Sequence, residues 1–308
     1  MNLENLKSKH FELVQVKDGI YAAIAKEGGG AIGNAGFVDL GDQTIVFDTF
    51  NTQQAAIDLK HIAESITNRS VDWVINSHWH GDHIRGNQVY KDSKIISSVE
   101  TRVKMLESHP ERIRKQKEDI KGLISYIKSL EERNLKEKDL SLENQINFLK
   151  EIETSLHTLE LVLPNFTFKE EFTFYGTKKT AKLFTFGGGH SNCDSFLYIP
   201  EDKTVFMGDL LFVNFHPSFF LESNPLEWKK ILEKLAKFEI EKVIPGHGVV
   251  GTKREILTLI RYFEDILELS TLKDVIEEIE LPKVYESWSH PEIFQTNLKM
   301  LKTSFQLK

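Results

Sequence analysis

Three histidines and an aspartate lie within six residues of this chain, at His78, His80, Asp82 and His83. The cluster directly follows the apolar run 71–75, which we expect to form a short buried strand over 71–76. Imidazole nitrogens suit borderline divalent metals, and a neighbouring carboxylate suits a metal site that also holds water. A metal site at a strand end therefore constrains the fold more than any other feature. The alternative is a polar loop that happens to be rich in histidine.

Four further residues argue against that alternative, because each is expected at the end of a strand. Asp48 ends the strand predicted over 44–47, and His190 follows the strand predicted over 183–186. Asp209 follows the strand that ends at position 207, and His247 follows the strand at 242–244. Glycines stand beside several of these residues, where they permit tight backbone turns. Strand ends are where α/β folds place their binding loops.

The order of the expected elements predicts an α/β fold. A hairpin at 37–48 precedes a helix at about 52–66. A second block has strands at 172–175, 181–186, 195–199 and 204–207, a helix near 226–238, a strand at 242–244, and helices from 252 onward. Two similar β-rich halves flanked by helices favour a four-layer αββα sandwich, formed by a single domain over 1–308.

A different stretch, 107–161, separates the two halves and is dense in lysine and glutamate. Ile113, Ile120 and Ile127 recur every seven residues, and Leu142, Leu149 and Leu156 do the same after a break near 134–139. This spacing predicts a helical hairpin inserted in the domain, with Ser141 capping its second arm. The hairpin could pack on its own domain, form a homodimer arm or cover the active site as a lid.

Composition narrows the classes of partner. The net charge of -7 and the pI near 5.9 argue against a general nucleic-acid binder. No run approaches the roughly 18 apolar residues of a membrane span, and the N-terminus has no apolar signal-peptide core. We therefore expect a cytoplasmic protein that acts on a small molecule. The single cysteine, Cys193, fits a reducing compartment and is interpreted as a bystander rather than a metal ligand.

The chain resembles the metallo-β-lactamase-fold hydrolase superfamily over roughly 21–252, apart from the insertion. The resemblance rests on the His-x-His-x-Asp-His run at 78–83, Gly-His-Ser at 189–191, Gly-Asp at 208–209 and Pro-Gly-His-Gly at 245–248. It implies two divalent metal ions, zinc by default, although iron or manganese would also accept these ligands. The implied ligands of the first ion are His78, His80 and His190, those of the second are Asp82, His83 and His247, and Asp209 bridges the two.

The resemblance also implies catalytic roles. A hydroxide held between the metal ions would attack the substrate, with Asp82 orienting it or accepting a proton and Asp209 holding both ions. Asp48 is similar to a supporting acid of the family that holds the ligand loops by hydrogen bonds. The alternative for Asp48 is an ordinary turn residue after a strand.

Asp209 discriminates within the superfamily. True β-lactamases of this fold usually have cysteine or serine at that position, whereas a bridging aspartate is typical of glyoxalase II-like thioesterases, lactonases and phosphodiesterases. The expected function is hydrolysis of a small ester, thioester or lactone. The alternatives are an iron-dependent persulfide dioxygenase, which keeps the same histidine run, and a non-catalytic metal-binding module.

Three further segments carry predictions: two near the motifs and the C-terminal tail. Phe215, His216 and Phe219 follow Asp209 closely and would either line an apolar substrate cavity or pack in the core. The glycine-rich run 27–34 lacks the ending of a phosphate-binding loop, so a mobile turn or flap near the site is expected. The tail from 285 to 305 has a helix-like pattern and is expected to dock on the domain.

Overall fold

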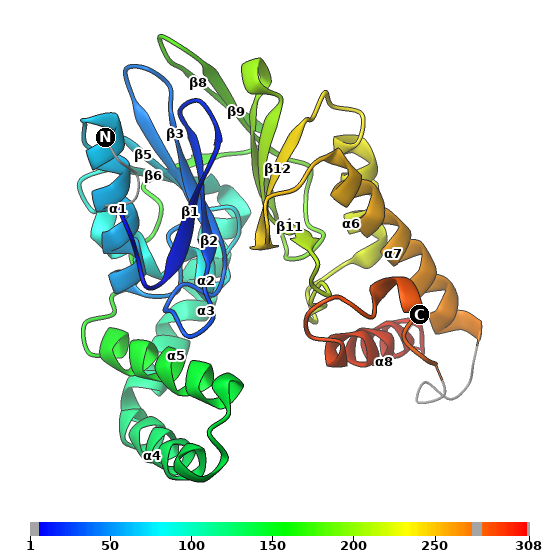
Figure 1. Ribbon diagram of the computed structural model, residues 1–308. Coiled ribbons are helices and arrows are strands. Elements are labelled where there is room, and N and C mark those ends of the chain that lie inside the picture. Colours follow the sequence, from blue (N-terminus) through cyan, green and yellow to red (C-terminus); the bar gives the residue numbers. More distant parts are fainter. Residues whose placement is uncertain (1–5, 273–278, 307–308) are drawn as a thin grey trace. The chain divides into compact units, whose positions relative to one another are not determined.

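The computed structural model describes residues 6–272 and 279–306. The chain forms two compact units, shown in Figure 1. The first unit comprises 1–169 with 174–180, and the second comprises 170–173 with 181–308. Among the described residues, none of the helices combines the length and apolar character needed to cross a membrane. The prediction of a single domain stays a prediction.

The first unit contains a seven-stranded mixed sheet in the order β1-β2-β3-β4-β5-β6-β7. Its strands are β1 (Phe11–Lys17), β2 (Ile20–Ala25), β3 (Ala35–Asp39), β4 (Thr44–Phe47), β5 (Trp73–Ile75), β6 (Lys94–Ser98) and β7 (Phe166–Phe168). The predicted hairpin is confirmed, because β3 and β4 pair antiparallel with Asp39 opposite Thr44. From β4 to β7 the pairing is parallel, so the segments that follow β4 and β5 start at the same sheet edge. That edge carries Asp48 and the histidine loop.

Helix α1 (Gln53–Thr67) confirms the helix predicted after the hairpin. Thr52 caps its N-terminus, where the side chain accepts a hydrogen bond from the Ala55 amide. Its buried face, which includes Ala55, Leu59 and Ile62, packs against β3 and β4. The apolar spacing in the sequence was sufficient to predict this face.

The insertion is present, but it differs from the predicted hairpin in three ways. It begins at Val99 rather than 107, and it contains three helices: α3 (Val99–Glu118), α4 (Ile120–Glu137) and α5 (Leu140–Leu156). Asp119, with φ of -98° and ψ of 20°, separates α3 from α4. The seven-residue spacing of isoleucines continues across this break and so conceals it. The cap of α5 is Asp139, whose side chain accepts from the Ser141 amide, and not Ser141 itself.

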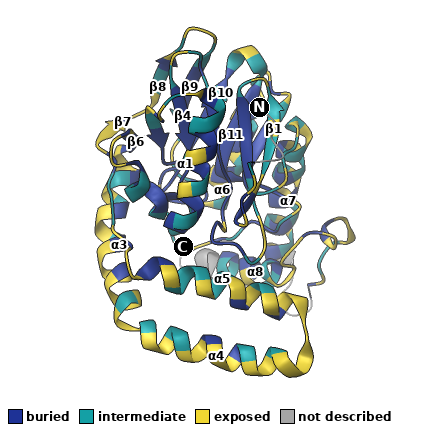
Figure 2. Ribbon diagram, turned by 60° about the vertical axis from the view of Figure 1, so that its left-hand side comes forward, coloured by how far each residue is buried: buried dark blue, intermediate teal, exposed yellow. Residues whose placement is uncertain are grey.

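The heptad residues of the insertion are covered within the first unit. Ile127, Leu130, Leu142 and Ile146 form one buried cluster between α4 and α5. Ile113, Leu156 and Leu159 form another, and α5 also contacts α1. Figure 2 shows the outer face of α4 as mainly exposed. The heptad stripes therefore serve packing on the insertion's own unit, and a homodimer through the insertion stays a prediction.

The second unit contains a five-stranded sheet in the order β12-β11-β10-β9-β8. Its strands are β8 (Glu171–Tyr175), β9 (Thr180–Thr185), β10 (Ser195–Ile199), β11 (Thr204–Val213) and β12 (Lys242–Gly248). Helices α6 (Pro225–Leu235) and α7 (Lys253–Leu272) pack together, α7 covers β11 and β12, and α8 (Glu292–Gln306) packs on α7. The predicted docking of the tail is confirmed for its described part.

Strands β11 and β12 are longer than predicted, so Asp209 and His247 lie within strands rather than after them. The parallel pairing shifts register near Gly208 and resumes where Phe212 faces His247. Proline and glycine in the sequence 245–248 are poor strand formers, and they led to the prediction of an early end. The strand propensities of these residues do not predict the register shift between β11 and β12.

His216 and Phe219 belong to the core of the second unit. Phe219 stacks on Phe263 with ring centroids 5.7 Å apart. His216 is 1% exposed and lies against Tyr262 and Trp288. Burial is the main cause that lowers the pKa of His216 to about 4, while Glu292 opposes the shift. The imidazole is therefore neutral at pH 7.

This burial predicts a pH dependence of stability. Because the folded-state pKa of His216 lies below its unfolded value of about 6.5, the unfolded chain binds the proton more readily. The contribution of neutral His216 to the free energy of unfolding is fully present above pH 6.5 and is lost as the pH falls toward 4. Between pH 7 and pH 5 the loss in the free energy of unfolding should be about 1–2 kcal/mol smaller in His216→Phe than in the unaltered chain.

Urea unfolding at pH 7, 6 and 5 measures this difference. His61→Phe, at an exposed position on α1, is the matched control and should keep the full slope. His109, whose burial lowers its pKa to about 4, leaves a residual slope in every variant. Parallel curves for the unaltered chain and His216→Phe would contradict the assignment.

Candidate metal centre

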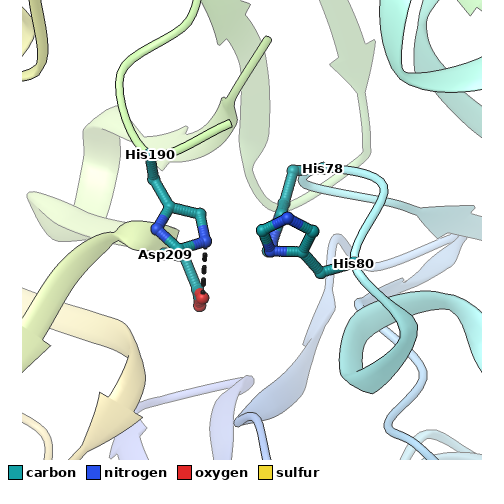
Figure 3. Close-up of side chains that lie close together, drawn as sticks. All are labelled: His78, His80, His190 and Asp209. Carbon is teal, nitrogen blue, oxygen red and sulfur yellow. Dashed lines mark ion pairs between the residues drawn. The ribbon is translucent and has the colours of Figure 1, made fainter. Parts of the chain in front are cut away.

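The loop after β5 gathers four candidate ligands within the first unit. His78 and His83 are fully buried, and His80 and Asp82 are half-buried. The ring of His78 lies 4.6 Å from that of His80 and 4.5 Å from that of His83, measured between centroids. Figure 3 shows the imidazoles of His78 and His80 side by side. A single tight loop, closed by the short helix α2 (Gly81–Ile84), thus brings three imidazoles together.

Asp48 organises this loop from beneath. Its fully buried carboxylate accepts hydrogen bonds from the Ser77 amide at 2.8 Å, from the Ser77 hydroxyl at 2.7 Å and from His83 Nδ1 at 2.8 Å. Burial raises the pKa of Asp48, and the contacts with His83 and Ser77 oppose that rise. The observed contacts match the supporting acid that the resemblance implies, although the role itself stays a prediction.

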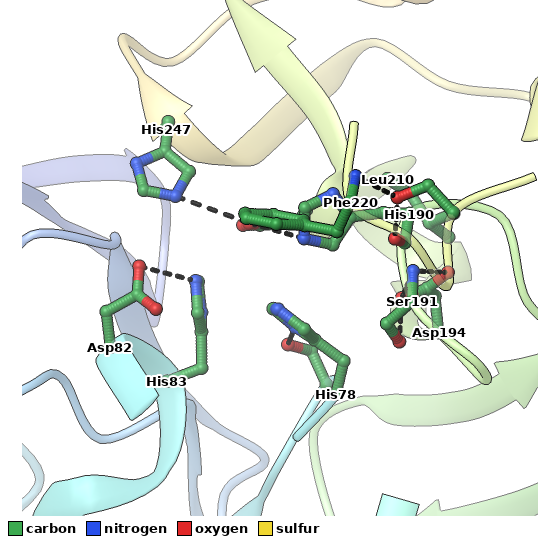
Figure 4. A network of polar contacts seen from close by, with 12 residues as sticks. His78, Asp82, His83, His190, Ser191, Asp194, Leu210, Phe220 and His247 are labelled. Carbon is green, nitrogen blue, oxygen red and sulfur yellow. Dashed lines mark hydrogen bonds and ion pairs between the residues drawn. The ribbon is translucent and has the colours of Figure 1, made fainter. Parts of the chain in front are cut away.

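These contacts also fix the tautomers of two histidines. Because His83 donates from Nδ1 to Asp48, its Nε2 carries the lone pair and lies 3.4 Å from Asp82 Oδ2 (Figure 4). The Ser77 hydroxyl gives its proton to Asp48, so it accepts from His78 Nδ1 at 2.9 Å. His78 Nε2 therefore also carries a lone pair. Both imidazoles thus have an unprotonated Nε2, the form that binds a metal ion.

The glycine-rich segment lies against this loop, near the site as predicted. A Cβ atom at Gly33 would lie 2.6 Å from His83 Nε2, so a larger side chain would collide with the imidazole. The segment is tied down by hydrogen bonds from the Gly30 amide to His10 Nδ1 and from the Asn51 amide to the Ala31 carbonyl. Its mobility stays a prediction.

The second unit presents the other three candidate ligands around one carboxylate oxygen. Asp209 Oδ2 lies 3.2 Å from His190 Nε2 (Figure 3) and 3.3 Å from His247 Nε2. Asp209 and His190 are buried, and His247 is partly exposed. A Cβ atom at Gly246 would lie 2.0 Å from Asp209 Oδ1, so only glycine admits the carboxylate here. Asp209 lies on β11 and His247 on its parallel neighbour β12, so the pairing of these strands brings the two side chains close.

Asp194 shapes the loop that holds His190, and sequence reasoning missed it. Its buried carboxylate accepts from the Gly189 amide at 2.8 Å, the Ser191 amide at 3.1 Å and the Ser191 hydroxyl at 2.7 Å. Figure 4 shows this network beside His190. The signal in the sequence was an aspartate at the end of a glycine- and serine-rich turn, where short polar side chains bond to nearby amides.

Other predicted residues lie apart from these groups. His216 and Phe219 are packed in the second unit's core, and Phe215 pairs with Ser289 in an isolated bridge. Cys193 Sγ lies 3.2 Å from Thr185 Oγ1. Within the described residues, Cys193 belongs to neither of the side-chain groups that could hold a metal ion.

Comparison with known proteins identifies the family. A family model described as the metallo-beta-lactamase superfamily matches residues 28–247, well over half of the chain. The chain therefore belongs to the metallo-β-lactamase superfamily. With its set of histidine and aspartate ligands, it is a metal-dependent hydrolase by class. No curated protein matches it.

Solved structures show the same fold. A metallo-β-lactamase from Pontibacter korlensis has a TM-score of 0.60 at 14% identity and covers 83% of this chain and 99% of its own. The DIM-1 metallo-β-lactamase also has a TM-score of 0.60, at 16% identity, covering 84% of this chain and 99% of its own. At these identities the likeness concerns the fold alone. The predicted α/β fold of the αββα type, with a helical insertion, is confirmed.

The contacts of Asp48 generate a prediction about metal affinity. Asp48→Asn keeps the side chain's size but replaces a charged acceptor oxygen with an amide NH₂ group, so one of its donors loses its partner. We expect the affinity for zinc to fall by about 10- to 100-fold. Competition with a chromophoric chelator measures the affinity. Asp92→Asn, at an exposed position, is the control, and equal affinities in the two variants would contradict the role.

Proposed function

We propose that the chain is a binuclear metal-dependent hydrolase that cleaves a small ester, thioester or lactone. The observation that carries the proposal is the position of Asp209, whose Oδ2 lies within 3.3 Å of two imidazole nitrogens. A carboxylate shared in this way suits a ligand common to two ions. Family membership supports combining the histidine loop of the first unit with the ligands of the second.

We propose the division of ligands that the resemblance implies. His78, His80 and His190 hold one ion, Asp82, His83 and His247 hold the other, and Asp209 is shared by both. Imidazole nitrogen and carboxylate oxygen suit zinc, iron and manganese, and zinc is the expected metal. The fit is supported by the fixed tautomers of His78 and His83, which present their Nε2 lone pairs.

Bound divalent ions lower the pKa of water from about 15.7 to about 7 and polarise a substrate oxygen. The chain's own groups supply the rest. To Asp82, whose side chain is 20% exposed, we assign the orientation of the attacking water or the acceptance of its proton. Asp48 and Asp194 hold the ligand loops in place by hydrogen bonds to backbone amides and side chains.

Asp209 supports the esterase, thioesterase or lactonase assignment over β-lactamase activity. The solved structures named above are metallo-β-lactamases by title, but their low identity carries only the fold. The resemblance implies that β-lactamases of this fold have cysteine or serine where this chain has Asp209. We also propose a small-molecule substrate, a cytoplasmic location and no role for nucleic acid.

Metal analysis gives the first test. We expect the purified chain to hold close to two transition-metal ions, because its seven candidate ligands exceed what one tetrahedral site can use. Elemental analysis after expression in metal-replete medium measures the ratio. A ratio that stays at one or below would contradict the binuclear assignment.

Loss of Asp209 gives the second test. Asp209→Ala should lower kcat by at least about a thousandfold while leaving one ion bound, because His78, His80 and His190 remain. Activity is measured on a panel of lactones, thioesters, phosphodiesters and β-lactams, with Asp92→Ala as the exposed control. Full activity in Asp209→Ala would rule out the proposed role.

The same experiment separates the rival functions. Oxygen consumption with a persulfide, together with bound iron, would identify a dioxygenase instead. Bound metal with no turnover of any compound in the panel would favour a non-catalytic metal-binding module.

A further inference from the structure

A cavity of about 500 Å³ lies within the first unit, and every residue that lines it belongs to that unit. One side is formed by the loop that carries Gly81, Asp82 and Arg85, and the other by α4 and α5 of the insertion. This volume falls in the range of small-molecule pockets. The cavity thus places a candidate metal ligand, Asp82, at one wall.

The lining contributed by α4 and α5 is apolar, whereas Gln116 of α3 and the exposed Asp119 after it add polar groups to the cavity. Leu123, Phe148, Leu149 and Ile152 are half-buried and line the cavity, and Leu156 is buried beside them. Leu123 and Leu149 pack from behind on the α4–α5 cluster, and Ile152 packs on the cluster of Ile113 and Leu156. The wall is therefore backed by packed side chains. A hydrocarbon that covers these surfaces removes apolar area from water, which is favourable.

Arg85 gives the opposite side a positive charge. Its Nη2 donates to Gln116 Oε1 at 2.8 Å, and its Nε makes no hydrogen bond. Burial lowers the pKa of Arg85, and the charge of Asp82 opposes that shift. A Cβ atom at Gly81 would lie 2.9 Å from Arg85 Nε, so glycine allows the guanidinium to lie against the backbone of the metal loop. In the proposed function, Asp82 gives its charge to a metal ion. With the Asp82 charge engaged by a metal ion, the half-buried guanidinium is suited to bind an anion.

Ile32 also lines the cavity, and its backbone adopts an unfavourable conformation. It has φ of 65°, a left-handed conformation that β-branched residues rarely adopt, and its side chain is 41% exposed. Strained backbone held by surrounding structure tends to occur at binding sites. Here the strain keeps an apolar side chain at the cavity rather than in the core.

We propose that this cavity binds the substrate's non-reacting part and selects amphipathic anions. The substrate's hydrocarbon arm lies along Phe148, Leu149 and Ile152, and its negatively charged group pairs with Arg85. The inference rests on the proposed function for placing the scissile bond at Asp82. The binding it predicts can be measured without turnover.

Calorimetric titration of the metal-loaded full chain with butane-, hexane- and octanesulfonate tests the site. Sulfonates carry a permanent charge and are weak metal ligands. We expect the Kd to fall about threefold to fourfold for each added methylene, because each one buries apolar area. Octyltrimethylammonium has the same arm with the opposite charge and should bind at least about tenfold more weakly than octanesulfonate.

Variants separate the two walls. Arg85→Gln should weaken octanesulfonate binding about tenfold or more and keep the chain-length dependence. Phe148→Ala should flatten the chain-length dependence, and Ile152→Ala provides a second wall variant should Phe148→Ala fold poorly. Arg133→Gln, at an exposed position on α4, and Ile57→Ala, at an exposed position on α1, are the matched controls and should bind like the unaltered chain.

The outcomes also distinguish the two proposals. Unchanged binding in both Arg85→Gln and Phe148→Ala, or tighter binding of the cationic ligand, would overturn the cavity assignment even if the enzyme hydrolyses a substrate. Selective octanesulfonate binding that both variants lose would support the cavity assignment even if no compound in the panel is hydrolysed. That absence of turnover would count against the proposed function alone.

Discussion

The buried carboxylate of Asp48 is the constraint on which the histidine loop depends. Asp48 adopts φ of 61°, a conformation that costs a non-glycine residue about 1–3 kcal/mol. Three hydrogen bonds to the charged carboxylate offset that cost, at about 1.5–3 kcal/mol each. Without donors from Ser77 and His83, neither the conformation nor the buried charge would be tolerated. The loop and its supporting acid therefore stabilise each other.

A comparable constraint acts in the second unit. The Asp209 carboxylate fits only because residue 246 lacks a Cβ atom, and β11 and β12 shift register beside it. Asp209 and His247 lie on these two neighbouring strands, and Asp209 Oδ2 is 3.3 Å from His247 Nε2.

The sequence predicted the grouping of the histidine loop better than it predicted the lengths of the strands in the second unit. Ligand types and their strand contexts were sufficient to group His78, His80, Asp82 and His83, because close spacing forces them into one loop. The lengths of β11 and β12 were wrong, because proline and glycine lower strand propensity although the pairing continues past them. Asp194 was missed, because its role depends on amides that a loop brings to it only when folded.

The insertion shows a different limit of sequence reasoning. Seven-residue spacing predicted helices correctly, but the same stripe served two purposes that spacing cannot separate. Ile127 and Leu142 are buried between helices, whereas Leu149 of the same stripe remains half-buried at the cavity. The packing of α4 against α5 buries only part of the apolar surface of these helices. The remainder, set opposite Arg85 and Asp82, is where an added helical segment would adjust substrate choice while the ligand loop stays unchanged.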